Sequence, residues 1–342
     1  MQFSVPDIRI VDVETCDFSM MATHSTEALL QAAYPLDWER YLDSAVSRRM
    51  VDALGVQARF LTQVPGRPPA PGRLTSFDLA RSAVLRLMAR RTDEFARLDA
   101  IIYVSTSNPN PCNSQAALLA EELGIRPSCM DLKAGCSGGV FGLAQAALLL
   151  HAGCERVLVV MAENLSQLTP PDDLRMLLTV GDGAACVLME RHPGPGFLSV
   201  VHGSEPSFAS TMTVPTPFPP TSPDAVYQYQ LQGANEAGEF LRDKWRSLFR
   251  DVLSSVRLGP TAIAHWFFHQ THGAQVDELL EDLDMKPSST VRVVHQHGNM
   301  GTPTFAVAMA RRFQALRPGQ KYLLQAVGGG ISWCAIVAEH QG

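Results

Sequence analysis

The chain has 342 residues, of which 46% are hydrophobic and 18% charged. This composition suits a globular enzyme with one large core or two medium ones, and it excludes collagen, coiled-coil, disordered and disulfide-rich miniature proteins. The formal net charge of −6 provides no overall field that would attract nucleic acid.

The cysteines and the apolar stretches indicate in which cellular compartment the protein is expected. Seven scattered cysteines without a CxxC pair are typical of reduced thiols, so we expect a cytoplasmic protein. The acid-containing N-terminal segment does not resemble a secretory signal. The most apolar stretch, 140–150, is too short to span a bilayer and predicts a buried helix.

Strands and helices are expected to alternate along the first half of the chain, which is typical of the α/β class. Four short runs rich in β-branched or aromatic residues predict buried strands at 98–106, 156–163, 184–190 and 196–203. Three further stretches predict helices at 77–91, 113–123 and 138–152. The first helix follows a Thr75/Asp78 capping-box pattern, and the other two end at Gly124 and Gly153.

The second half repeats this pattern. Helices are expected at 236–256, at 273–284 and after Thr302 and Pro303, where threonine is a natural N-cap and proline a natural first helical residue. Strands are expected at 263–270, at 290–295 and on both sides of the glycine run 328–330.

Two proline-rich segments lack periodicity. Residues 204–225 hold six prolines and are either a plain linker or a loop that lines a substrate entrance; the sequence favours neither. Residues 59–72 are expected to form a second surface loop.

Cys136 lies in a glycine-rich turn, 135–139, between a short predicted strand and an apolar predicted helix. At the start of that helix, free backbone N–H groups and the helix dipole favour the thiolate. We therefore predict a nucleophilic thiol with a lowered pKa. The other six cysteines are expected to be ordinary packing residues.

Two polar residues follow in similar positions. The segment HQTHG puts His269 at the carboxyl end of a predicted strand, where α/β folds place their sites. The segment HGNMGT puts Asn299 in a glycine-flanked turn before a predicted helix. Taken alone, His269 is more typical of a buried core histidine and Asn299 more typical of turn chemistry, so their functional weight comes from the presence of Cys136.

Five motifs together resemble the thiolase superfamily, and within it the β-ketoacyl-acyl-carrier-protein synthase III branch. They are DLKAGCSGG, HQTHG, HGNMGT, GDGAACVL at 181–188 and GGGISW at 328–333. The resemblance runs in order from about residue 54 onward. It implies a duplicated five-layered α/β/α/β/α fold with halves at 1–192 and 193–342, a homodimer, and a Cys136-His269-Asn299 site between the halves.

The same resemblance implies an acyltransferase whose substrates are thioesters of coenzyme A or acyl carrier protein. Cys136 would hold the acyl group covalently, and His269 and Asn299 would stabilise the enolate of a malonyl-type extender as carbon dioxide leaves. The backbone N–H groups of Cys136 and Gly329 would form the oxyanion hole. No metal or redox cofactor is required. Asp182 in GDG would be structural, near the dimer interface.

Two single residues depart from the family pattern. Cys112 stands where many relatives carry an aromatic residue that lines the acyl pocket, so it is the acyl-pocket candidate. The smaller side chain is equally typical of a different or larger acyl group and of a simple packing change. His272 replaces the last residue of an HQAN-like motif. These departures favour a specialised polyketide or secondary-metabolite pathway over fatty-acid initiation.

Charge patterns bear on the carrier of the substrate. The helix after His269 is acidic, which would repel an acidic carrier protein and favours coenzyme A. The preceding helix has a basic stripe that is either a carrier-docking site or a solvated face. The acidic residues are Asp277, Glu278, Glu281, Asp282 and Asp284, and the basic ones Arg242, Arg246 and Arg250.

The same residues bear on other possible functions. Acyl transfer to a hydroxyl or amine, with His269 as general base, stays open, whereas a non-catalytic partner subunit is disfavoured because the three site residues are present. Five histidines between 265 and 297 lack a metal-ligand spacing such as HExxH. The chain also lacks GxSxG and a GxGxxG before a helix, so neither a serine hydrolase nor a dinucleotide site is expected.

Overall fold

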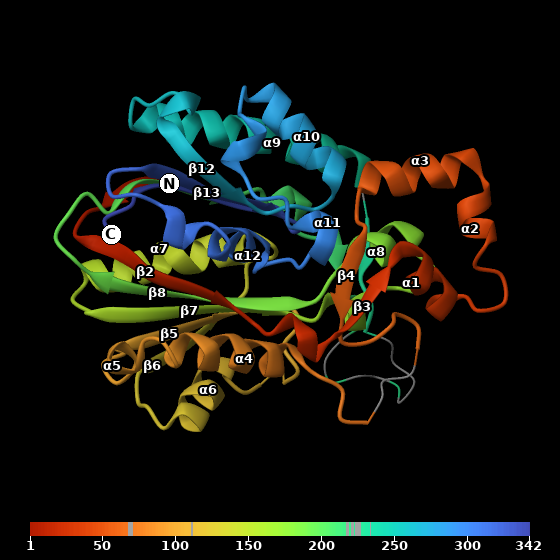
Figure 1. Ribbon diagram of the computed structural model, residues 1–342, viewed down its shortest axis with the longest axis horizontal. Helices are drawn as coiled ribbons and strands as arrows, with labels where there is room; N and C mark the ends of the chain where they lie inside the picture. The colour runs from red at the N-terminus through yellow and green to blue at the C-terminus, as the bar shows by residue number, and fades with distance from the viewer. Residues whose placement is uncertain (68–70, 111, 217–218, 220–221, 223–226, 233) are drawn as a thin grey trace.

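The computed structural model describes residues 1–67, 71–110, 112–216, 219, 222, 227–232 and 234–342. Two five-stranded sheets lie face to face with helices between them and on both outer sides (Figure 1). From one outer side to the other, the layers are α4 and α6, the first sheet, α7 and α12, the second sheet, and α9 and α10. The predicted thiolase-like α/β/α/β/α fold is confirmed.

The first sheet has the strand order β2-β8-β7-β5-β6. β5 is parallel to β6 and β7, whereas β8 is antiparallel to β7 and β2. The predicted strands at 98–106, 156–163 and 184–190 are confirmed. Their bounds are β2 Ile8–Thr15, β5 Ala100–Val104, β6 Ser128–Leu132, β7 Arg156–Glu163 and β8 Gly183–Arg191.

The second sheet has the order β1-β9-β14-β13-β12. β12 and β13 are parallel, so both carboxyl ends reach the same edge, and β13 returns through the glycine run into β14. β1 pairs with β9, so residues 2–5 join the sheet of the second half; the 192/193 boundary itself stays a prediction. The bounds are β1 Gln2–Val5, β9 Phe197–Ser204, β12 Ile263–Phe268, β13 Lys321–Gly328 and β14 Ser332–Glu339.

The long helices form where they were predicted. The Thr75/Asp78 capping box is present, and Gly124 ends its helix in the left-handed region with φ +67°. α7 is apolar on nearly all sides because it lies between the two sheets. The bounds are α4 Ser76–Met88, α6 Gln115–Leu123, α7 Gly138–His151, α9 Ala234–Ser255, α10 Gly273–Asp282 and α12 Thr304–Ala310.

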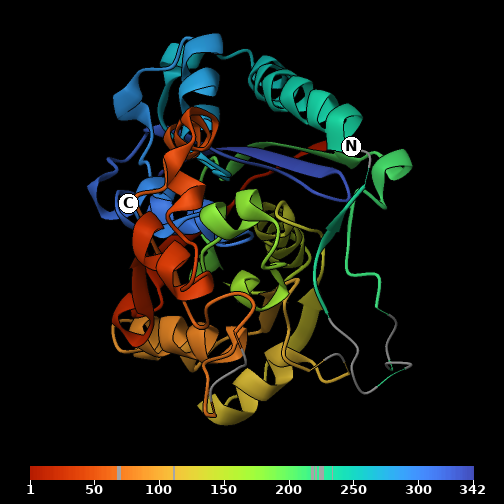
Figure 2. The same cartoon turned by 90° about the vertical axis from the view of Figure 1, so that its right-hand side faces the viewer.

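The short helices and strands between residues 22 and 61 lie at one end of the molecule, the right-hand side of Figure 1 and the face turned to the viewer in Figure 2. No helix among the described residues is long and apolar enough to cross a membrane. The bounds of the short helices and strands are β3 Ala22–Ser25, β4 Ala58–Leu61, α1 Thr26–Ala33, α2 Arg40–Asp43, α3 Ala45–Leu54, α5 Thr92–Phe95, α8 Leu174–Thr179 and α11 Val294–His297. A two-stranded ribbon joins β10 Met212–Thr213 to β11 Gln230–Leu231.

The strand predicted at 290–295 is wrong. Residues 290–293 are irregular and α11 follows them. The side chain of Gln270 replaces a neighbouring strand: its Oε1 accepts from the Val293 and Val294 amides (2.9 and 3.1 Å), and its Nε2 donates to the Val291 carbonyl (2.7 Å). The backbone polar groups are therefore satisfied without a β-ladder.

Two further expectations need correction. Thr302 does not cap α12, because its hydroxyl donates to Glu163 Oε1 (3.0 Å) and Pro303 occupies the cap position. The segment 59–72 is not a loop throughout, since its first residues belong to β4, which pairs with β3. Residues 68–70 of that segment lie outside the described residues.

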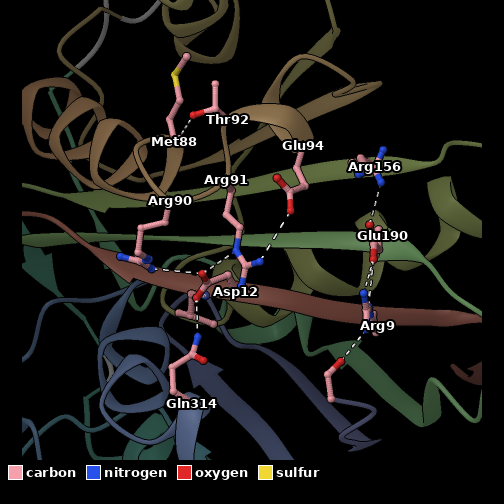
Figure 3. Close-up of polar contacts among 12 residues, drawn as sticks. Arg9, Asp12, Met88, Arg90, Arg91, Thr92, Glu94, Arg156, Glu190 and Gln314 are labelled. Carbon is pink, nitrogen blue, oxygen red and sulfur yellow. Dashed lines mark hydrogen bonds and ion pairs between the residues drawn. The ribbon is translucent and has the colours of Figure 1, made fainter.

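The two edge strands of the first sheet differ in character. β2 carries the buried acids Asp12 and Glu14, and Arg90 forms ion pairs with both; Arg91 donates to Asp12 Oδ2 (3.0 Å) (Figure 3). The α4 helix ends before these two arginines, three residues earlier than expected, and they turn toward β2. Inward charges of this kind discourage edge-to-edge pairing. At the other edge, the apolar side chains of β6 are only half-buried.

Candidate active site

The turn that carries Cys136 is in backbone contact with the glycine run of the β13–β14 hairpin. Gly135 has φ +55°, and a Cβ there would lie 2.6 Å from the Gly329 carbonyl oxygen. A Cβ at Gly328 would lie 2.7 Å from the Cys136 nitrogen. Side chains at either position would push the two turns apart, so both glycines are needed to bring Gly329 beside the thiol.

A pair of serines ties these turns together. The hydroxyls of Ser137 and Ser332 are 2.7 Å apart, and both donate to the Ala134 carbonyl, at 2.8 and 3.1 Å. Ser137 is fully buried. Ser332 belongs to the GGGISW motif, so the two motifs are joined by side chains as well as by the backbone. No pattern in the sequence predicts this role for either serine.

The predicted lowering of the Cys136 pKa is wrong for the resting protein. The residue is half-buried, and burial raises the pKa of its thiol to about 12, with the negative charge of Glu163 adding to the rise. The backbone amides of Gly329 and Cys136 act in the opposite direction. The start of α7 thus provides amide groups around the sulfur, but desolvation outweighs them.

This thiol pKa predicts an unusual alkylation profile. The thiolate is the nucleophile, so its fraction in the free protein should rise about tenfold per pH unit from pH 7 towards 12. Iodoacetamide labelling of Cys136, followed by peptide mass spectrometry between pH 7 and 10, should therefore increase without levelling off. Urea-unfolded protein, in which the thiol pKa returns to its ordinary value, is the control. A plateau below pH 8 in the folded protein would contradict the prediction.

His269 follows β12 at the edge where β12 and β13 both end. It is 1% exposed, and its amide donates to the Gln325 carbonyl of β13 (2.9 Å). Burial lowers the pKa of its ring to about 4, and the Gly301 backbone acts in the opposite direction. Neither ring nitrogen has a hydrogen-bond partner of normal geometry among the described residues. The ring is therefore neutral near pH 7, with both nitrogens available to a substrate.

Asn299 is fixed by its backbone and by one end of its side chain. Its amide donates to the Thr179 carbonyl (2.7 Å), its carbonyl accepts from Gly181 (2.9 Å), and its Oδ1 accepts from the Gly301 amide (2.9 Å). A Cβ at Gly181 would lie 1.8 Å from the His297 carbonyl oxygen, so only glycine fits there. The GDG motif thus positions Asn299, and the bond from Gly301 leaves Nδ2 as the end of the side chain that can donate to a ligand.

Asp182 of the same motif is structural, as predicted. Its carboxylate accepts from the amide and hydroxyl of Thr62 (both 2.8 Å) and from the amide and hydroxyl of Ser166 (2.9 and 2.6 Å). These bonds join β4 to the segment after β7. Its predicted place near a dimer interface stays a prediction.

A buried carboxylate that the sequence analysis missed lies where these motifs meet. Glu163 ends β7 and is fully buried. It accepts hydrogen bonds from Thr106, Ser107 and Thr302, and its charge acts on Cys136. The only feature of the sequence that could have indicated this role is an acidic residue at the end of a predicted strand of mostly apolar residues.

Met212 of the proline-rich excursion and Tyr229, which follows it, also reach the site. A Cβ at Gly329 would lie 3.1 Å from the Met212 sulfur. The Tyr229 hydroxyl lies 3.4 Å from Thr106 Oγ1, and burial raises its pKa, with Glu163 and Cys136 as lesser causes. These contacts favour the interpretation of an entrance-lining loop for the described part. Residues 217–218, 220–221 and 223–225 lie outside the described residues.

The remaining predicted site residues lie elsewhere. Cys112 is exposed in the connection between β5 and α6, and its acyl-pocket role stays a prediction. On α9, Arg242 and Arg250 are exposed, whereas Arg246 is half-buried and its Nε donates to Asp282 Oδ2 of α10 (2.6 Å). The basic stripe and the acidic helix therefore partly neutralise each other.

The five clustered histidines have separate surroundings. His272 caps α10 by accepting from the Gln275 amide (3.2 Å), His295 Nδ1 lies 2.6 Å from the Gly55 carbonyl, and His297 Nε2 lies 3.3 Å from Arg311. Over the described part of the chain, no three His, Cys, Asp or Glu side chains are grouped to hold a metal ion.

Comparisons with known proteins agree with this architecture. Residues 130–206 match the 3-oxoacyl-[acyl-carrier-protein (ACP)] synthase III family and residues 253–340 match its C-terminal family. The chain is 31% identical over 324 residues to β-ketoacyl-[acyl-carrier-protein] synthase III 3 of Streptomyces coelicolor, covering 86% of this chain and 92% of that one. It is 30% identical over 275 residues to the synthase III of Deinococcus deserti, covering 75% of each.

Solved structures show the same fold at lower identity. A 3-oxoacyl-(acyl-carrier-protein) synthase from Burkholderia xenovorans LB400 has a TM-score of 0.83 and 19% identity, covering 100% of this chain and 96% of that one. Xanthomonas campestris OleA has a TM-score of 0.79 and 17% identity, covering 98% and 99%.

The fold and the family matches define the class of protein as a thiolase-like condensing enzyme. Within that class, the chain belongs to the 3-oxoacyl-[acyl-carrier-protein] synthase III family.

Proposed function

We propose that this protein forms an acyl-Cys136 thioester and condenses it with a malonyl-type extender, with loss of carbon dioxide. The observation that carries the proposal is the backbone contact between the Cys136 turn and the Gly328–Gly330 run, which sets two backbone amides against the sulfur. Amides in this position can stabilise the oxyanion of an attacked thioester carbonyl.

The acylation step requires a base, because burial raises the pKa of the thiol. His269 is neutral near pH 7 and has free ring nitrogens among the described residues, so it can accept the proton as the sulfur attacks the acyl donor. The amides of Cys136 and Gly329 hold the oxyanion. As the thioester bond of the donor breaks, His269 gives the proton to the leaving sulfur, so coenzyme A or the carrier leaves as a thiol and the imidazole is neutral again.

The condensation step uses His269 and Asn299 as neutral hydrogen-bond donors. A neutral imidazole and the Asn299 Nδ2 group donate to the thioester carbonyl of the extender, which stabilises the enolate as the carboxylate leaves as carbon dioxide. The enolate carbon then attacks the acyl-cysteine carbonyl and frees the sulfur. This sequence needs no metal or redox cofactor from the protein.

Coenzyme A thioesters are the proposed donors in preference to acyl carrier protein. Arg246 of the basic stripe is already paired with Asp282, and the side chains of α10 around it are acidic. An acidic carrier protein would meet a surface of little net attraction. The departures from the family pattern at Cys112 and His272 support a specialised pathway. The seven free cysteines support a cytoplasmic location.

Intact-protein mass spectrometry tests the function directly. The protein is incubated with a panel of acyl-coenzyme A donors, with malonyl-coenzyme A added or withheld. The proposal expects a stable acyl adduct that malonyl-coenzyme A discharges, with release of carbon dioxide and a β-ketoacyl product. An adduct that malonyl-coenzyme A leaves untouched would instead support transfer to a hydroxyl or amine. No adduct with any donor would overturn use of coenzyme A thioesters.

We further propose a homodimer that pairs through β6. This strand is the open edge of the first sheet opposite β2, and its only charged residue, Asp131, is engaged in capping α6. The buried charges of β2 protect the other edge. Only β6 therefore offers an apolar edge of this sheet to a second copy.

Glutamate at Cys129 should break this dimer. Cys129 is half-buried on β6, and a charge introduced there would be desolvated in a paired edge. Size-exclusion chromatography with light scattering should show a dimer for the wild type and at least about a tenfold weaker association for Cys129→Glu. Val11→Glu, at a half-buried position on β2, is the matched control and should stay dimeric. A monomeric wild type, or a folded Cys129→Glu dimer, would contradict the prediction.

A further inference from the structure

Glu163 is a buried acid without a cation. It is fully buried, and it takes part in none of the ion pairs among the described residues. Its two oxygens are satisfied by neutral donors: the Thr106 amide (3.0 and 3.1 Å) and the hydroxyls of Thr106 (3.0 Å), Ser105 (3.4 Å), Ser107 (2.6 Å) and Thr302 (3.0 Å). A site made only of donors selects a carboxylate, which is acceptor-only when ionised.

The bond to Thr302 reaches the turn that carries Asn299. Gly301 donates to Asn299 Oδ1 (2.9 Å) and its backbone lies against the His269 ring. A Cβ at Gly301 would lie 3.2 Å from the Glu163 side chain. Glu163 therefore touches the 299–302 turn at two successive residues.

The same turn packs against the first residues of α7. A Cβ at Gly139 would lie 2.5 Å from the Thr302 carbonyl oxygen, and one at Gly138 would lie 3.5 Å from Thr302 Cγ2. The Thr302 methyl faces the nucleophile helix, while its hydroxyl faces Glu163. The 299–302 turn is thus held between the helix that follows Cys136 and the carboxylate that ends β7.

We propose that Glu163 is a positioning residue for the condensation step: through Thr302 it fixes the 299–302 turn so that the Asn299 amide meets the extender thioester. The inference rests on the proposed condensing function. Glu163 touches no reacting atom in this scheme. It contacts the turn at Thr302 and Gly301, and only its charge acts on the Cys136 thiol. Its loss should impair the step that needs Asn299 more than the acylation of Cys136.

Thr302→Val and Thr302→Ser test the link. Valine keeps the shape and the methyl contact but removes the hydroxyl, whereas serine keeps the hydroxyl. Acylation of Cys136 is followed by intact mass, and decarboxylation of malonyl-coenzyme A by release of carbon dioxide. We expect Thr302→Val to slow decarboxylation about tenfold and acylation less than about twofold, and Thr302→Ser to retain most of both rates.

Glu163→Gln completes the test. Every partner of the Glu163 side chain is a donor, whereas glutamine has only one acceptor oxygen. Its amide nitrogen must therefore face a donor, and the hydrogen bonds on that side of the side chain are lost. Decarboxylation should slow as in Thr302→Val, whereas acylation should not slow, because glutamine also removes the negative charge that raises the pKa of the Cys136 thiol. The double variant Glu163→Gln/Thr302→Val should be no slower in decarboxylation than the slower single variant, as expected of residues that act as one unit. Thr290→Val is the matched control: Thr290 is another buried threonine, its hydroxyl has no hydrogen-bond partner among the described residues, and the ratio of the two rates should stay unchanged.

Three outcomes separate the possibilities. Equal losses in both half-reactions, or equal behaviour of Thr302→Val and Thr302→Ser, would overturn the positioning role while leaving the proposed function intact. A wild type that acylates but does not decarboxylate malonyl-coenzyme A would overturn the proposed function and this inference with it. If Glu163→Gln fails to fold, the valine and serine variants of Thr302 still decide the question.

Discussion

Replacing Cys136 by alanine is expected to abolish acyl transfer completely. The Cys136 sulfur is the atom that would hold the acyl group. Without it, the backbone amides of Cys136 and Gly329 remain, but no nucleophile lies beside them. Alanine should fit the half-buried position with little strain. Intact mass spectrometry after incubation with acyl-coenzyme A should therefore show an adduct on the wild type and none on the variant.

Cys154→Ala is the matched control for this experiment. Cys154 is another half-buried free thiol, placed just beyond the opposite end of α7, so its loss tests whether adducts form on cysteines in general. The Cys154→Ala variant should be acylated on Cys136 at the wild-type rate. An adduct of unchanged size on Cys136→Ala would show that another residue is the nucleophile and would sink the assigned role.

Asn299→Ala is expected to separate the two half-reactions. The substitution removes the Nδ2 donor and also the Oδ1 that accepts from the Gly301 amide. It keeps the backbone bonds to Thr179 and Gly181, so the turn should persist. Loss of one such donor typically costs about 3 kcal/mol of transition-state stabilisation. We therefore expect acylation of Cys136 within about twofold of the wild type and malonyl-coenzyme A decarboxylation at least ~100-fold slower.

The two rates are measured on the same preparation, by intact mass and by carbon dioxide release. Gln296→Ala serves as control, because Gln296 is exposed on α11 in the same segment and bonds only to Arg311 among the described side chains. It should leave both rates unchanged. Normal condensation by Asn299→Ala would remove Asn299 from the mechanism, and equal loss of both rates would point to a disrupted turn.

Most of the local structure could be predicted from the sequence. The capping box at Thr75, the glycine that ends α6, and the buried strands β7 and β8 are fixed by residues close together in the chain, and such signals need no partner to be recognised. The fold class and the places of Cys136, His269 and Asn299 at the ends of their strands and turns followed from these elements and from the ordered motifs.

What failed depended on distant residues. The strand expected at 290–295 is replaced because Gln270 supplies the hydrogen bonds from another element. Thr302 has the side chain of an N-cap, but Glu163, 139 residues earlier, takes its hydroxyl. Local propensity could predict neither outcome, because a tertiary contact competed for the same donor or acceptor.

The sequence by itself thus determined the layered α/β architecture, the motifs and the identity of the nucleophile candidate. Only the tertiary structure decided the electrostatics of the site: the thiol pKa is raised because the folded chain removes water from Cys136 and brings Glu163 near it. A helix start alone predicts the opposite sign. Desolvation depends on everything packed around a group, and that packing exists only when segments far apart in the chain have come together.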